Sequence, residues 1–154
     1  SIQSIHKDDV IPNWLSNYVK KHNDYNWLFR LHPTQHYNDV NWKGCDDLNY
    51  VNIQEASEIP LYNLLKITKI NITLWSSVAI EALNLGIKTI IIHQEGKRIY
   101  EDQLYDGDFE YCDNESIFDN CLKSNLKLKF SPIECIQTDR YKIEESFFKF
   151  INSI

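Results

Sequence analysis

The stretch that decides the fold runs from Ile70 to Ile92 and reads INITLWSSVAIEALNLGIKTIII. It begins with a strand-like run, Ile70–Leu74, passes through a turn that carries two hydroxyls, and continues as a helix from about Ser77 to Leu85. Gly86 follows where glycine commonly ends a helix. The apolar, β-branched run Thr89–Ile92 is typical of a central parallel strand buried on both faces. This order of strand, helix and strand predicts an α/β fold.

The rest of the chain alternates helix-like and strand-like stretches in the same way. The further strands that the pattern predicts are Trp27–Leu31, Tyr50–Ile53 and an edge strand at Phe109–Tyr111. The further predicted helices are Asn13–His22, Pro60–Thr68, Arg98–Leu104, Ser116–Leu122 and Arg140–Ile151. We therefore expect residues 1–154 to form one compact domain, a three-layer, Rossmann-like α/β domain with a mainly parallel sheet.

Composition narrows the class of protein. A net charge of −6 argues against nucleic acid as a partner, because nucleic acids are bound by basic surfaces. The four cysteines have no metal-binding spacing, so we expect reduced, mostly buried thiols and a cytoplasmic setting; they are Cys45, Cys112, Cys121 and Cys135. The chain has no Met, and we interpret Ser1 as the start of a domain taken from a longer protein.

The turn at Ser76 and Ser77 is the first candidate site. It lies between a predicted strand and the first helical N–H groups, which lack partners within the helix and favour an anion. A phosphate there gains those donors and two hydroxyls, at the sheet edge where α/β proteins bind ligands. The alternative is that Ser76 only caps the helix.

A second polar element, His32-Pro33-Thr34, follows another predicted strand. The imidazole of His32 can donate a hydrogen bond to a phosphate, and it can stabilise the charge on a departing nucleotide. Thr34 adds a hydroxyl to the same expected phosphate site. Taken alone, His32 also fits a structural histidine at a strand end, so the case depends on two such elements sharing one edge.

Three further side chains complete the expected site. Glu81 lies about one helical turn beyond Ser77 and can bind a ribose hydroxyl, or be an ordinary exposed helix residue. His93 and Glu95 follow the central strand and are candidates for contact with the sugar or the base, although a plain surface loop also explains them. Turn chemistry accounts for Asp46-Asp47 and Asp106-Gly107-Asp108, so we predict neither a metal ion nor a cofactor.

The His-Pro pair and the segment LYNLLKITKINITLWSSVAIEALNLGIKTIII, residues 61–92, resemble the C-terminal half of GT-B glycosyltransferases that build bacterial surface polysaccharides. Polysialyltransferases and CDP-glycerol glycerophosphotransferases, with their His-Pro and Ser-Ser motifs, look most similar. The resemblance covers roughly Trp27 to His93. It implies one half of a GT-B fold, with His32 as the catalytic residue, Ser76 and Ser77 at the donor phosphate, and Glu81 near the ribose.

The resemblance also implies a reaction class. Many retaining GT-B enzymes carry a second Glu eight residues before the one at Glu81, and this chain has Thr73 there, which favours inversion. The expected ligand is a CMP-, CDP- or UDP-linked sugar or polyol used in capsule or other polysaccharide synthesis. The catalytic base and acceptor site belong to an N-terminal domain that this chain lacks, so the isolated domain is expected to be inactive. The full-length enzyme is expected in the cytoplasm, with peripheral association at the inner face of the membrane left open.

Two other functions remain open. A UDP-N-acetylglucosamine 2-epimerase-like enzyme shares the fold and a serine-containing phosphate turn, but such turns usually contain glycine and Trp75-Ser76-Ser77-Val78 has none. A non-catalytic α/β module that mediates protein contact is the third possibility, and weak or absent nucleotide binding would favour it.

Overall fold

The computed structural model describes residues 11–127 of the chain. Its elements, in chain order, are α1 (Asn13–Lys21), β1 (Trp27–Leu28), the 3-10 helix η1 (Tyr37–Asp39), β2 (Val51–Asn52), α2 (Gln54–Glu58), α3 (Leu61–Ile67), β3 (Ile70–Thr73), α4 (Val78–Asn84), β4 (Lys88–Ile91), α5 (Gln94–Ile99), α6 (Glu101–Tyr105), β5 (Phe109–Tyr111) and α7 (Glu115–Lys127). Over the described range the protein is α/β, as the sequence predicts.

The strands of the described range form two small parallel sheets. β1 pairs with β2, and Trp27 lies opposite Val51. The other sheet has the order β3-β4-β5, in which Ile90 lies opposite Ile72 on one side and Glu110 on the other. The parallel direction of the strands is confirmed. The expectation of a single sheet is not met within residues 11–127, where the strands are divided between two.

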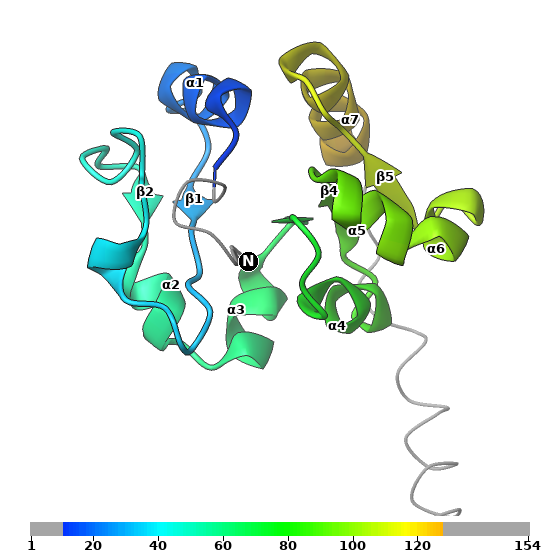
Figure 1. The fold of residues 1–154 in the computed structure, drawn as a ribbon, viewed down its shortest axis with the longest axis horizontal. Coiled ribbons are helices and arrows are strands. Elements are labelled where there is room, and N and C mark those ends of the chain that lie inside the picture. The colour runs from blue at the N-terminus through cyan, green and yellow to red at the C-terminus, as the bar shows by residue number, and fades with distance from the viewer. Residues whose placement is uncertain (1–10, 128–154) are drawn as a thin grey trace, which may run out of the picture.

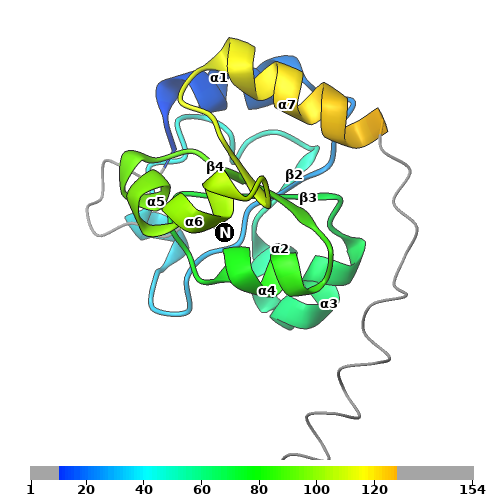
Figure 2. The ribbon, with the colours of Figure 1, turned by 90° about the vertical axis from the view of Figure 1, so that its right-hand side faces the viewer.

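Helices cover both faces of the strands (Figures 1 and 2). α1 and α7 lie together on one side, and α2, α3 and α4 lie on the other. The contact between α1 and α7 is aromatic: the ring of Phe118 is 5.3 Å from that of Trp14 and 5.1 Å from that of Tyr18, both edge-on. Such edge-to-face pairs add to the area that the rings bury.

The central strand β4 is the most deeply buried part of the larger sheet. Ile90 and Ile91 are fully buried, which confirms the interpretation of this apolar run as a strand covered on both faces. The polar side chain of Thr89 on the same strand is also buried, and it accepts a hydrogen bond from Asn71 on β3. Gly86 ends α4 with φ +70°, a conformation that side-chain-bearing residues rarely adopt, and this prediction too is confirmed.

Several boundaries differ from the sequence predictions. β1 and β2 contain only two residues each, and helix α2 was not predicted at all. The helix predicted at Arg98–Leu104 is two helices that meet at Tyr100, and the first of them begins at Gln94. The alternative that His93–Gly96 is a plain surface loop is therefore wrong, because His93 caps α5 and Gln94 begins it. The helix predicted at Arg140–Ile151 lies outside the described residues.

The described cysteines are free thiols, as expected. Cys45 and Cys112 are buried, Cys121 is half-buried, and Cys135 lies outside the described range. Burial raises the pKa of all three described thiols, so they stay protonated at neutral pH. None of the helices in the described range combines the length and the apolar character that a membrane crossing needs.

Candidate phosphate-binding site

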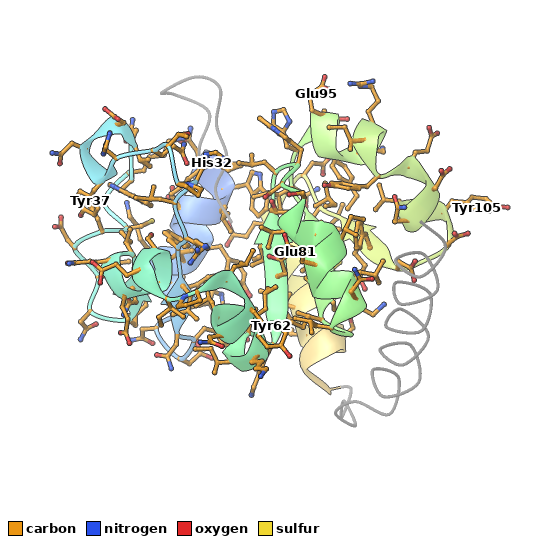
Figure 3. All side chains as sticks on the ribbon, turned by 90° about the horizontal axis from the view of Figure 1, so that it is seen from below. His32, Tyr37, Tyr62, Glu81, Glu95 and Tyr105 are labelled. Atoms are coloured by element: carbon orange, nitrogen blue, oxygen red, sulfur yellow. The ribbon has the colours of Figure 1, made fainter. Side chains whose placement is uncertain are left out.

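Polar segments follow three of the strands, four residues beyond the end of β1 and two residues beyond the ends of β3 and β4. His32 comes after β1, the turn Trp75–Ser77 comes after β3, and His93 comes after β4. Strands β3 and β4 pair in parallel, so the second and third segments meet at one edge of their sheet. Figure 3 shows His32 at the same edge of the molecule as Glu95, which lies two residues beyond His93.

The turn after β3 is held from within the protein. The Thr73 hydroxyl accepts a hydrogen bond from the Ser76 N–H at 3.2 Å. The Tyr100 hydroxyl, which reaches the turn from the junction of α5 and α6, donates to the carbonyl oxygens of Ser76 (2.8 Å) and Trp75 (3.3 Å). Burial raises the pKa of Tyr100, so the phenol keeps its proton at neutral pH. These bonds fix the backbone on which Ser76 and Ser77 stand.

A glycine brings the neighbouring helix close to the end of β3. A Cβ at Gly96 would lie 1.8 Å from the carbonyl oxygen of Leu74 and 2.6 Å from the Ile91 side chain. No other residue fits without a shift of the backbone, since real Cβ atoms do not approach a carbonyl oxygen so closely. Gly96 therefore sets the position of α5, and with it the position of His93 and Glu95 beside the turn.

The two serines have different surroundings. Ser76 is buried, and its hydroxyl lies 3.4 Å from the Val78 N–H, which makes it a weak local cap. Ser77 is exposed and precedes α4, but its side chain makes no capping hydrogen bond. Helix α4 starts at Val78, one residue later than predicted, and has only seven residues. Of the two hydroxyls, that of Ser77 is the one open to a ligand.

His32 is oriented by the residues that follow it. Its Nδ1 lies 2.7 Å from the Thr34 hydroxyl and accepts from the Thr34 N–H at 3.3 Å. The His32 N–H in turn donates to the Gln35 side chain at 3.0 Å. Because Nδ1 accepts, the neutral ring carries its proton on Nε2, where it can donate to an anion. Thr34 thus contacts His32 itself, and its hydroxyl is committed to orienting the ring.

His93, which follows β4, has a similar arrangement. Its Nδ1 accepts from the Glu95 N–H at 3.1 Å and caps α5. The neutral ring of His93 therefore also carries its proton on Nε2. Its ring centre lies 4.6 Å from that of Trp75, with an angle of 59° between the planes. Trp75 and His93 join the turn after β3 to the turn after β4.

The two acidic side chains are placed differently. Glu81 is exposed on α4, one turn beyond Ser77, and its N–H donates to the Ser77 carbonyl at 3.4 Å. Glu95 is also exposed, but its carboxylate accepts from both Nε and Nη2 of Arg98. Since such a surface pair contributes little stability, Arg98 can move aside for a ligand at low cost. Glu81 has no comparable partner among the described residues.

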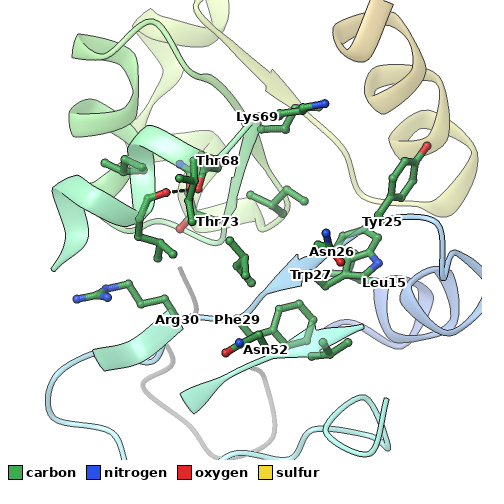
Figure 4. Close-up of a pocket in the computed structure, with 18 of the residues that line it drawn as sticks. Leu15, Tyr25, Asn26, Trp27, Phe29, Arg30, Asn52, Thr68, Lys69 and Thr73 are labelled. Carbon is green, nitrogen blue, oxygen red and sulfur yellow. Dashed lines mark hydrogen bonds between the residues drawn. The ribbon is translucent and has the colours of Figure 1, made fainter. Parts of the chain in front are cut away.

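A cavity of about 980 Å³ lies between β1 and β3 (Figure 4), and neither His32, Ser77 nor His93 lines it. The candidate site is accordingly a surface edge with fixed polar turns and not an enclosed pocket. Among residues 11–127, no three His, Cys, Asp or Glu side chains are grouped to hold a metal ion.

Sequence reasoning missed three residues that shape this edge. Tyr100 is 24 residues from Ser76 and Gly96 is 22 residues from Leu74, so no local pattern indicates either contact. Trp75 stands inside the quoted motif, and an aromatic residue in a strand-to-helix turn was a signal that could have been used. The chain matches no protein-family model, and neither curated proteins nor solved structures provide a match.

Proposed function

We propose that this chain is the donor-binding domain of an inverting bacterial glycosyltransferase, and that it holds a nucleotide-linked sugar or polyol by its phosphate. The observation that carries the proposal is the fixed polar edge after β1, β3 and β4. There Ser77 is exposed and its hydroxyl makes no capping hydrogen bond to helix α4. Backbone N–H groups donate to Nδ1 of both His32 and His93, which leaves Nε2 of each ring as the donor.

The chemistry of this edge suits a phosphate group. Two Nε2–H groups and a serine hydroxyl are neutral hydrogen-bond donors, and a phosphate oxygen accepts readily from each of them. As the nucleotide leaves, negative charge grows on its phosphate, so donors fixed beforehand stabilise the transition state more than the bound donor. We assign this role to His32, with Ser77 as the phosphate-binding hydroxyl, Ser76 as part of the turn and Thr34 as the residue that orients His32.

The surroundings of Thr73 support inversion. Thr73 stands where a retaining relative would carry a glutamate, and it is buried with its hydroxyl accepting from the Ser76 N–H. The threonine at this position holds the turn through its hydroxyl, and it has no carboxylate. Glu81, exposed one turn beyond Ser77, is the group we assign to the ribose.

The remaining parts of the proposal concern the whole protein. We propose a three-layer, Rossmann-like half of a GT-B enzyme, in which an N-terminal domain supplies the acceptor site and the catalytic base. A CMP-, CDP- or UDP-linked donor and a role in capsule or related polysaccharide synthesis suit a cytoplasmic enzyme that works at the inner face of the membrane. The isolated domain is then expected to bind the donor without turning it over.

The test is a titration of the 154-residue chain with CMP, CDP, UDP, GDP and inorganic phosphate, followed by calorimetry and by NMR. We expect one of the nucleotides to bind, with shifts at Ser77 and His93. Loss of a hydrogen bond to a charged group costs about 1.5–3 kcal/mol, so Ser77→Ala is expected to weaken binding about ten- to a hundredfold.

The matched control is Ser124→Ala, an exposed serine on α7 whose hydroxyl donates to the Cys121 carbonyl. Its affinity for the nucleotide is expected to equal that of the unmodified chain. If none of the ligands binds, the proposal is wrong and a module for protein contact becomes the better explanation. Equal affinity in Ser77→Ala and Ser124→Ala would place the nucleotide elsewhere on the chain.

A further inference from the structure

Two cysteine side chains meet where the end of β5 lies against α7. Cys112 directly follows β5, and Cys121 is part of α7. Their sulfur atoms are 3.3 Å apart, and the Cys112 thiol donates to the Cys121 sulfur. Because the sulfurs of a disulfide lie about 2.05 Å apart, a further approach of about 1.3 Å separates this contact from a covalent bond.

The two segments that carry the thiols are held in place by other contacts. The Cys112 N–H donates to the Ile91 carbonyl at 2.9 Å, which ties the end of β5 to β4. Helix α7 is held by Phe118, whose buried ring contacts the rings of Trp14 and Tyr18 on α1. The sulfur contact is therefore a consequence of the fold, and the two thiols stay close together while the chain is folded.

The cysteines differ in their access to solvent. Cys112 is fully buried, whereas Cys121 is half-buried. A small reagent in solution therefore reaches the Cys121 sulfur first, and Cys112 lies directly behind it. Cys45 is fully buried elsewhere in the core, where its thiol is directed at the Ser16 carbonyl at 3.9 Å. One accessible thiol backed by a second is the arrangement of a cysteine pair that forms a disulfide.

The Cys121 thiol has a proton acceptor beside it. Burial, and after it a hydrogen bond to Glu110, raise the pKa of Cys121. The raised pKa makes the reduced pair slow to react, because the thiolate is the nucleophile. Glu110 lies on β5, two residues before Cys112, and its carboxylate can take the proton as the Cys121 sulfur attacks.

We propose that Cys112 and Cys121 are a redox-active pair, which a small disulfide such as oxidised glutathione converts into a disulfide that fixes α7 to the sheet. The Cys121 sulfur attacks one sulfur of the oxidant, and the proton of Cys121 passes through Glu110 to the first glutathione that leaves. Cys112 then attacks the Cys121 sulfur, and its proton goes to the second glutathione. Two protein thiols are oxidised, and the oxidant is reduced to two thiols.

The bond is expected to stabilise the folded chain. It closes the loop from Cys112 to Cys121 and restricts the unfolded chain, while the folded chain already holds the sulfurs in contact. We expect the melting temperature to rise by about 5–10 °C on oxidation. The proposal stands apart from nucleotide binding, because neither cysteine belongs to the polar edge after β1, β3 and β4.

Oxidation of the unmodified 154-residue chain tests the proposal. The folded chain is treated with oxidised glutathione at about pH 8.5, the remaining thiols are blocked, and the protein is analysed by peptide mass mapping. We expect Cys112 to be joined to Cys121 within one chain, and dithiothreitol to reverse the bond. Absence of this bond, or a bond from Cys121 to Cys135 or to a second chain, would overturn the proposal.

Serine variants test the order of the two steps. Cys112→Ser is expected to stop at the mixed disulfide and to keep one glutathione on Cys121. Cys121→Ser is expected to gain no glutathione at Cys112, because that sulfur is buried. Cys45→Ser is the matched control and is expected to form the bond as the unmodified chain does. Glutathione that attaches to Cys112 in folded Cys121→Ser contradicts this order.

The melting temperatures of the oxidised and reduced unmodified chain give a measure that needs no variant, so the proposal remains testable if a serine variant does not fold. Equal melting temperatures would show that the bond does not fix α7 to the sheet, and the proposal would be wrong.

Discussion

The indole of Trp75 and the imidazole of His93 lie with their ring centres 4.6 Å apart, although they follow different strands. Trp75 directly precedes Ser76 in the turn after β3, and His93 caps α5 after β4. The contact makes one continuous surface from the two turns. A ligand that binds Ser77 is then expected to change the surroundings of the Trp75 indole.

Trp75 provides a fluorescence signal for that ligand. The chain has four tryptophans; Trp27 and Trp42 are buried in the core, and Trp14 packs against Phe118. We expect nucleotide binding to change the emission of the unmodified chain, and Trp75→Phe to abolish that change because the reporter beside the site is lost. Trp42→Phe is the control and is expected to keep the change. A signal that survives in Trp75→Phe contradicts the placement of the ligand.

Gly96→Ala tests the close approach of α5 to β3. Helix propensity alone predicts that alanine stabilises a helix by about 1 kcal/mol relative to glycine. The contact of the added Cβ with the Leu74 carbonyl predicts the reverse, a loss of about 3 kcal/mol, because both backbones must move. Urea denaturation measures the difference.

The control for Gly96→Ala is Gly107→Ala. A Cβ at Gly107 meets nothing within 4 Å, and the only cost is its φ of +79°, about 1–2 kcal/mol. A Gly96→Ala variant that is as stable as the unmodified chain would show that α5 does not press against the end of β3.

His32→Ala is expected to weaken nucleotide binding about tenfold, because one hydrogen bond to a charged group is lost. His36→Ala is the matched control, an exposed histidine four residues away whose side chain makes no capping bond. Calorimetry measures the nucleotide affinity of both variants. Equal losses of affinity would show that His32 does not contact the nucleotide.

Asp119→Asn tests the link between α1 and α7. The Lys123 ammonium, and after it the Tyr18 hydroxyl at 2.8 Å, hold the pKa of Asp119 below its usual value. A lowered pKa means that the ionised carboxylate stabilises the folded chain above about pH 4, and that this contribution is lost as the pH falls through the folded pKa. We therefore expect Asp119→Asn to lower the melting temperature at pH 7 and to matter little at pH 2.

The control for Asp119→Asn is Asp47→Asn, at an exposed aspartate in the loop after η1. It is expected to leave the melting temperature unchanged at both pH values. If Asp119→Asn lowers the melting temperature equally at pH 7 and pH 2, the ionised carboxylate of Asp119 is not what stabilises the folded chain.

The sequence by itself determined the alternation of strands and helices. The apolar run of β4 and the glycine after α4 are local signals: burial on both faces requires the first, and a positive φ requires the second. The positions of His32, Ser77 and His93 after strands were also visible, because they depend only on chain order. The length of β1 and the existence of α2 were not, since short elements depend on the contacts that cover them.

Only the tertiary structure decided how these parts act together. Ser76 and Ser77 look alike in the sequence, yet folding buries one and exposes the other. Gly96 on α5 and Tyr100 at the junction of α5 and α6 contact Leu74 and Ser76, which lie more than twenty residues earlier in the chain. Within residues 11–127, the pairing of the strands in two sheets likewise follows from packing, because a hydrophobic pattern identifies a strand but not its neighbour.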